Sequence, residues 1–193
     1  MAKKRAKIIE DSDLEKILTY IDDNKRFPLR DKVAVLLSVK AGLRAKEIAN
    51  LQWYAVEKSD GSLREYMELG SEVTKGGTER VVPINKHLAK ALKQLRKSRP
   101  RDKYIVHSDA GPNKRTSGAM RKWFHYLYNS EIGLKGCSSH SGRRTAITKL
   151  ARIHGNYDCS IVEVQRFAGH ADLATTASYI EPSKNVRKLV DAI

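Results

Sequence analysis

The sequence predicts a mostly helical α+β domain with one small, three-stranded antiparallel sheet. Apolar residues recur at helical spacing through the first fifty residues and again from residue 86 onward. Between residues 52 and 84 the pattern changes to short β-rich runs, which Ser59-Asp60-Gly61-Ser62 and Lys75-Gly76-Gly77 separate as turns. With 193 residues, 40% of them hydrophobic, the chain can form one domain with an apolar core.

The helices are expected in a definite order. Ser12 or Asp13 is a candidate cap for a first helix that ends near residue 22. A strongly apolar helix over 31–41 follows Pro28, and Gly42 is placed to end it in the left-handed conformation. A short helix over 45–50 comes next, and Pro83 stops the last strand. The remaining helices are expected at 86–97, 117–129, 141–153, 160–167 and 173–180, with the longest linker over 98–114.

Three parts are expected along the chain: a basic, flexible arm over 1–10, a domain over 11–180 and a C-terminal tail over 181–193. The arm has no apolar run or cleavage site behind it, so it is not a secretory signal. In the tail, Val186, Leu189 and Val190 are at helical spacing. This apolar stripe fits docking on another subunit and packing on its own domain equally well.

The charge balance points to a polyanionic partner. Lys and Arg number 37 and Asp and Glu 22, which gives a formal net charge of +15, and nucleic acid is the commonest polyanion. A membrane surface is the competing partner. However, the sequence has no basic amphipathic helix, no lipid signal and no apolar run near the ~20 residues of a membrane span.

The two cysteines, Cys137 and Cys159, form no CxxC pair and have no cluster of ligand histidines nearby. We therefore expect reduced thiols in a cytoplasmic protein. Neither a disulfide framework nor a metal site is predicted.

Five short motifs follow one another along the chain, and each has an ordinary explanation when taken alone. A lone arginine is usually a surface charge, and a lone tyrosine is usually a packed aromatic. The motifs are Gly42-Leu43-Arg44-Ala45-Lys46-Glu47, Val73-Thr74-Lys75-Gly76-Gly77, His140-Ser141-Gly142-Arg143, Gly169-His170 and Thr175-Thr176-Ala177-Ser178-Tyr179. Together, in this order, they resemble the catalytic domain of the tyrosine recombinases, the phage-integrase and Xer-type family. The resemblance covers nearly the whole chain and implies that catalytic domain over 11–180.

The residue types suit cleavage of a phosphodiester without a metal ion. A guanidinium stays charged and can bind two oxygens at once, so Arg44 and Arg143 are candidates to stabilise the transition state if the fold gathers them. Tyr179 is the candidate nucleophile. Its ordinary pKa is about 10, so nearby positive charge or a base must favour the phenolate. His140, three residues before Arg143, can share a helical face with it.

The resemblance implies roles for further residues. Lys75 is expected to protonate the departing 5′ oxygen, and His140 to act as a general base or to position the phosphate. His170 is expected to donate a hydrogen bond to a nonbridging oxygen and to brace the helix of Tyr179. Glu47 is expected to orient a catalytic side chain. No cofactor is expected, because a phosphotyrosyl bond keeps the energy of the broken phosphodiester.

Two features depart from the family pattern. Gly142 stands where the family usually has an apolar residue, and we expect it to lose packing and to add backbone freedom beside His140 and Arg143. Typical members also carry a separate N-terminal core-binding domain, for which this chain has no room. We expect either a minimal, Xer-like member or the catalytic part of a longer protein.

Double-stranded DNA is the expected partner, and the resemblance implies a homotetramer on DNA and a monomer or dimer when free. The candidate DNA contacts are Lys114, Arg115, Arg121 and Lys122, which open a helix, and Arg144. The leading hypothesis is a site-specific recombinase or integrase that acts through a 3′-phosphotyrosyl intermediate. A type IB-like topoisomerase with the same residue set, and a non-catalytic DNA-binding or regulatory protein that retains the fold, are the alternatives.

Overall fold

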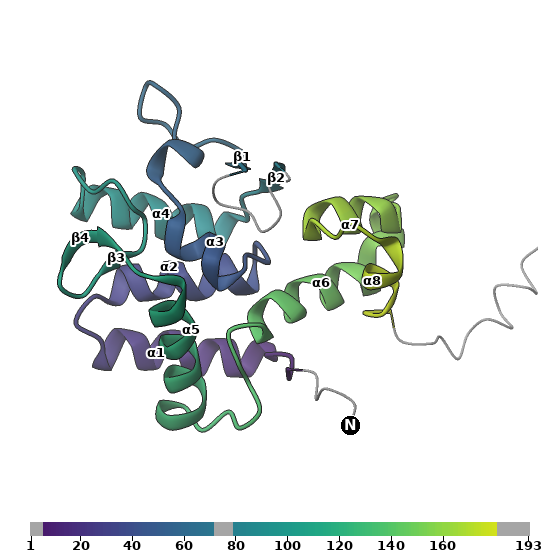
Figure 1. Ribbon diagram of the computed structural model, residues 1–193, viewed down its shortest axis with the longest axis horizontal. Coiled ribbons are helices and arrows are strands. Elements are labelled where there is room, and N and C mark those ends of the chain that lie inside the picture. Colours follow the sequence, from purple (N-terminus) through teal and green to yellow (C-terminus); the bar gives the residue numbers. More distant parts are fainter. Residues whose placement is uncertain (1–5, 72–78, 181–193) are drawn as a thin grey trace, which may run out of the picture. The chain divides into compact units, whose positions relative to one another are not determined.

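The computed structural model describes residues 6–71 and 79–180. The chain divides into two compact units, 1–146 and 147–193 (Figure 1). Helix α6 starts in the first unit and ends in the second. In the described ranges, no helix is long and apolar enough to cross a membrane. The chain is mostly helical with small antiparallel sheets, which confirms the predicted fold class.

The helices largely confirm the predicted order, with bounds that differ by a few residues. In the first unit they are α1 (Asp11–Asn24), α2 (Pro28–Val39), the short α3 (Ala45–Asn50), a 3-10 turn (Trp53–Ala55), α4 (Lys86–Ser98), α5 (Ser117–Tyr126) and a π-helical turn (Leu127–Glu131). Helix α6 (Ser141–Ile153) then leads to a 3-10 turn (His154–Tyr157), α7 (Ile161–Ala168) and α8 (Leu173–Ala177).

Among the helix ends that differ from the prediction are those of α1, α2 and α8. Helix α1 begins at Asp11, with Glu10 at its N-cap, so neither Ser12 nor Asp13 caps it. Pro28 starts α2 at its first position, where the missing N–H of proline costs no hydrogen bond. Helix α8 ends at Ala177, so Tyr179 lies in the turn after the helix rather than within it.

Helix α2 is the centre of the first unit. It is buried on nearly every side, with Val33, Val35 and Leu37 fully inaccessible, and it packs against both α1 and α4 (Figure 1). Burying a side chain of this size contributes about 1.5–3 kcal/mol. The loop that leaves α2 is therefore held by a well-packed element, and this loop carries Arg44.

In place of the expected three-stranded sheet, the described residues form two separate two-stranded sheets. β1 (Tyr66–Leu69) pairs with β2 (Arg80–Pro83), in antiparallel register with Leu69 opposite Arg80. The first expected strand is wrong, because Val56 follows the 3-10 turn and only an isolated bridge joins Glu57 to Leu63. β3 (His107–Ser108) and β4 (Gly111–Lys114) form the second sheet in the predicted linker, where few β-branched residues indicate a strand.

The N-terminal arm is shorter than predicted, because residues 6–10 pack on the first unit. Ile9 is 1% exposed, and its N–H donates to Thr145 Oγ1 at 2.7 Å. Lys7 donates its N–H to the Gly136 carbonyl, and Arg144 donates to the Ala6 carbonyl. An apolar side chain at position 9 gives this segment a buried anchor, so 6–10 are part of the domain. Residues 1–5 and the tail 181–193 lie outside the described residues.

We predict that Ile9→Ala lowers the free energy of unfolding by about 2–5 kcal/mol, the usual cost of truncating a buried isoleucine. Ile8→Ala is the matched control, because Ile8 is only partly buried and should cost markedly less. Urea denaturation of both variants measures the difference. If both variants lost equally little free energy of unfolding, residues 6–10 would not be packed on the domain, and the predicted flexible arm over 1–10 would be correct.

Candidate functional site

The turn after α2 places the first predicted arginine. Gly42 has φ of 65°, in the left-handed region that favours glycine, which confirms its predicted conformation, although α2 already ends at Val39, two residues before the predicted end. The Leu43 N–H donates back to the Leu37 carbonyl at 3.0 Å. Arg44 is extended and stands immediately before α3. The chain therefore reverses at Gly42 and starts a new helix at once, which limits how Arg44 can be oriented.

Arg143 reaches the same turn from a distant part of the sequence. Its Nη1 donates to the Gly42 carbonyl at 2.7 Å, between residues 101 positions apart, and Arg143 is only 5% exposed. The accepting carbonyl is two residues from Arg44. The fold thus gathers the two arginines at one turn, as the phosphodiester hypothesis requires.

Glu47 is the acidic centre of this cluster and is fully buried. Its Oε2 accepts the Arg44 N–H at 2.7 Å and Arg80 Nη2 at 2.8 Å, and its Oε1 accepts Arg44 Nη1 at 2.9 Å. The first contact is the usual one of a third-position glutamate with the N-cap residue of a helix. Glu47 therefore orients both the backbone and the guanidinium of Arg44.

The cluster carries more positive than negative charge. Arg44, Arg80 and Arg143 supply three guanidinium groups, and Glu47 supplies one carboxylate. Burial lowers the pKa of Arg80 below its ordinary value; Glu47 opposes this shift and Arg44 adds to it. Of the two arginine side chains that pair with Glu47, Arg44 is the more accessible, at 24% against 6% for Arg80. The cluster can therefore offer the partly accessible guanidinium of Arg44 to an anion.

His140 stands directly before α6 and is exposed. Its carbonyl accepts the Arg144 N–H at 2.9 Å in the first turn, and its own N–H donates to Ser138 Oγ at 3.2 Å. Three residues later, Arg143 is buried and anchored. One helix start thus presents an accessible imidazole and a fixed guanidinium.

Gly142, between these two residues, is in close contact with α2. A Cβ built on Gly142 would lie 2.3 Å from Ser38 Oγ, 2.8 Å from Ser38 Cβ and 3.0 Å from Val39 Cγ2. No side chain fits at these distances without a shift of one helix. The expectation that Gly142 loses packing and adds freedom is therefore wrong, because glycine here lets α6 approach α2 closely.

His170 and Tyr179 belong to the second unit and contact one another. Their rings stack with centroids 5.7 Å apart and planes inclined by 24°. Thr176, which is buried, places its Oγ1 2.9 Å from His170 Nδ1, and Gln165 Nε2 donates to the His170 carbonyl at 3.0 Å. The Tyr179 ring packs on the small core of this unit, which comprises Ile147, Ala151, Val164 and Ala168.

Lys75 lies outside the described residues, within 72–78. Of the candidate DNA contacts, Arg121 and Lys122 are on the second turn of α5, and Lys114 is exposed on β4, where it donates to Asn50. Both Arg121 and Lys122 are exposed. Arg144 is half-buried and holds the N-terminal segment through Ala6.

Arg115 is a correction to the predicted DNA contacts. Its side chain is 7% exposed and pairs with Asp109 at 2.6 Å, and the same carboxylate also pairs with the buried Arg30. Its guanidinium further lies 5.5 Å from the Trp123 ring. Arg115 is thus committed to internal contacts and serves the packing of the β3–β4 hairpin.

Arg80 is the member of the cluster that sequence reasoning missed. Along β2 the exposure alternates, so Arg80 and Val82 point inward while Val81 is 56% exposed. This two-residue period was readable in the sequence, because it places Arg80 in phase with Val82. An arginine in an inward phase indicates a buried partner, and that partner is Glu47.

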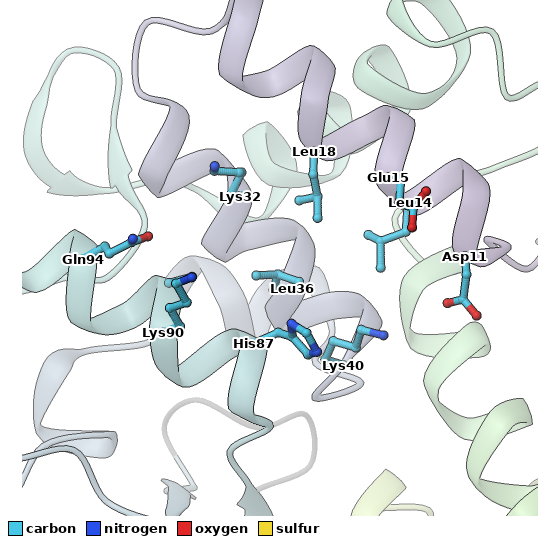
Figure 2. Close-up of a pocket in the computed structure, with 11 residues that line it drawn as sticks. Asp11, Leu14, Glu15, Leu18, Lys32, Leu36, Lys40, His87, Lys90 and Gln94 are labelled. Atoms are coloured by element: carbon cyan, nitrogen blue, oxygen red, sulfur yellow. The ribbon is translucent and has the colours of Figure 1, made fainter.

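A groove between α1, α2 and α4, with a volume of about 610 Å³, lies apart from these residues. Figure 2 shows Leu14 and Leu18 projecting from α1 toward Leu36, with Lys40 and His87 at the opposite edge. None of the predicted catalytic residues lines it. Among the residues that the structure describes, no group of three or more His, Cys, Asp or Glu could hold a metal ion.

Comparison with known proteins identifies the family. The sequence model of the Phage integrase family matches residues 7–185. The chain belongs to the phage integrase family. Among integrase-family relatives, it is 27% identical to the tyrosine recombinase XerD of Listeria monocytogenes over 192 residues, and 27% identical to the tyrosine recombinase XerA of Pyrococcus horikoshii over 194 residues.

The aligned parts cover 92% and 98% of this integrase-family chain but only 59% and 62% of those two recombinases. Solved structures agree on the fold. The XerH site-specific recombinase bound to its difH substrate superposes with a TM-score of 0.73 at 21% identity, over 100% of this chain and 55% of that one. For XerA recombinase the TM-score is 0.72 at 18% identity, over 96% of this chain and 64% of that one.

We predict that Gly142→Ala lowers the free energy of unfolding by about 1–3 kcal/mol, because the added methyl overpacks the contact with Ser38. The sign is informative, since alanine in a helix otherwise stabilises by up to about 1 kcal/mol relative to glycine. Urea denaturation measures the change.

The matched rescue is Ser38→Gly, which removes the two nearest atoms of the clash. The double variant Ser38→Gly with Gly142→Ala should lose less stability than the sum of the single losses. Strict additivity of the two losses would show that Gly142 is not in restrictive contact with Ser38.

Proposed function

We propose that this chain is the catalytic domain of a site-specific DNA recombinase that cleaves and rejoins DNA strands through a 3′-phosphotyrosyl link to Tyr179. The cluster around Glu47 carries this proposal: Arg44 is oriented and partly accessible, and Arg143 is anchored at the same turn. Oriented guanidinium groups with an excess of positive charge are what a phosphodiester undergoing substitution requires. The XerD and XerA relatives are tyrosine recombinases, and the XerH neighbour is a recombinase bound to its DNA substrate.

The cleavage step uses this chain's own side chains. Arg44 and Arg143 bind the nonbridging oxygens, and their charge favours the phenolate of Tyr179. The phenolic oxygen attacks phosphorus, His140 takes the phenolic proton, and the bond to the 5′ oxygen breaks. Lys75 gives a proton to that oxygen, while His170 donates a hydrogen bond to the phosphate and braces Tyr179 by stacking on its ring.

Rejoining is the same step in reverse. A 5′ hydroxyl attacks the phosphotyrosine, and Tyr179 regains its proton as the new phosphodiester forms. Because the covalent link keeps the energy of the original bond, the cycle needs neither ATP nor a metal ion.

Double-stranded DNA is the proposed partner, and the working assembly is a homotetramer on two duplexes, with a monomer or dimer when free. The 37 basic residues support binding to the phosphate backbone. Two structure neighbours, XerH and the Tn1549 transposon integrase, are bound to DNA, and a third is a lambda integrase dimer on a core site.

We predict that the protein forms a denaturation-resistant adduct with a pool of nicked duplexes whose central sequence is randomised. The nick lets the short cleaved strand diffuse away, so the phosphotyrosyl link accumulates. The adduct is measured on a denaturing gel, and its attached DNA is sequenced. Tyr179→Phe should abolish the adduct and leave binding unchanged, because only the nucleophilic hydroxyl is removed.

Three other outcomes count against the proposal. Binding without any adduct favours a DNA-binding protein that retains the fold. An adduct with relaxation of supercoils but no strand exchange favours a topoisomerase. An adduct that persists in Tyr179→Phe places the nucleophile elsewhere.

We also predict that Arg121→Gln with Lys122→Gln lowers the salt dependence of DNA binding, by about 0.9 in logarithmic slope for each phosphate that the variant leaves unneutralised. Arg115→Gln is the contrast, because its guanidinium pairs internally with Asp109. It should lower stability and leave the slope unchanged. Binding titrations over a range of salt concentrations measure both slopes, and an unchanged slope for the double variant would remove α5 from the DNA interface.

A further inference from the structure

The mechanism above gives Arg80 no role, although it is the most buried guanidinium on Glu47. Its Nη2 donates to Glu47 Oε2 at 2.8 Å, and the two side chains are 6% and 0% exposed. Arg80 is committed to Glu47 and stands outside the five motifs from which the contacts with the scissile phosphate are proposed. What it touches is the carboxylate that orients Arg44.

We propose that Arg80 is a positioning residue that acts through Glu47 to keep the Arg44 guanidinium available to the scissile phosphate. The inference rests on the proposed function and deepens it. In this role Arg80, on β2, neutralises part of the charge of Glu47, and Glu47 in turn orients Arg44.

The charge of the trio supports this role. Arg44, Glu47 and Arg80 together carry one net positive charge, whereas Arg44 and Glu47 alone would be neutral. A phosphate would then compete with the buried carboxylate for Arg44. Because Glu47 Oε2 accepts from Arg80, the carboxylate is partly neutralised before DNA arrives, which weakens its attraction for the Arg44 guanidinium that donates to Oε1.

The cost of the pair argues against a purely structural role. Burying an arginine and a glutamate carries a desolvation penalty that apolar residues of similar size avoid, and such residues often hold a structure as well or better. Val82, the next inward residue of β2, is apolar and fully buried, so β2 already has an apolar anchor. The charge at position 80 is therefore explained by what it does to Glu47.

The test compares Arg80→Gln, Glu47→Gln and the double variant by their maximal rate of adduct formation at saturating nicked duplex. We expect Arg80→Gln to slow adduct formation about 10- to 100-fold, below the loss from removing a direct transition-state donor. Arg80→Lys should recover part of the rate, because its ammonium can still donate to Glu47. The double variant should be no slower than Glu47→Gln alone, because Arg80 acts through that residue.

Arg96→Gln is the matched control for lost stability. Arg96 makes two hydrogen bonds of 2.7 Å to Glu57 in the same unit, and its loss should lower the melting temperature without slowing adduct formation. Duplex affinity, measured in the Tyr179→Phe background, should change little with Arg80→Gln, since the defect lies in the rate.

A duplex with a 5′-bridging sulfur separates two routes of action. The thiolate leaving group, with a thiol pKa near 8.5, needs no proton donor, so a defect that works through Arg44 persists on this substrate. Three results would each overturn the proposal for Arg80. They are a normal rate of adduct formation for Arg80→Gln on the ordinary duplex, recovery of that rate on the sulfur-containing duplex, and additive losses of rate in the double variant. Absence of any wild-type adduct would instead overturn the proposed function.

Discussion

A single buried carboxylate organises the cation cluster of this protein. Glu47 has no access to water, so its charge must be balanced within the fold, and it is balanced by two guanidinium groups of unequal exposure. The Arg80 side chain is buried, and the Arg44 side chain is partly accessible to solvent. The difference in exposure is what makes this ion-pair cluster a candidate site, because the more accessible Arg44 is the better placed of the two to exchange a protein partner for a ligand.

The backbone supplies the second constraint. The left-handed Gly42 lies in the turn after α2, leads the chain toward Arg44 and offers its carbonyl to Arg143. Close approach of α6 to α2 then depends on Gly142, which leaves room for Ser38. Two glycines with different tasks, one conformational and one steric, thus bring distant arginines to one turn.

The proposed nucleophile has a separate framework. Tyr179 packs on a small apolar core formed by the end of α6 and by α7, and its ring stacks on His170. His170 in turn is held by Thr176 and Gln165. Each compact unit therefore holds its own part of the proposed chemistry: the cations in one, and the phenol with its imidazole in the other.

The order of residues along the chain was enough to establish the family, the order of the helices, the glycine end of α2 and the motifs that hold Arg44, Arg143, His170 and Tyr179. The helix order and the left-handed Gly42 follow from local periodicity and turn composition, whereas the family follows from the five motifs in their order along the chain. The folded structure was needed to show that Gly142 packs tightly, that Arg115 is buried, that residues 6–10 belong to the domain, and that Arg80 pairs with Glu47. Each of these depends on a partner dozens of residues away or on another element, and burial of a charge is decided by that partner rather than by its neighbours in sequence.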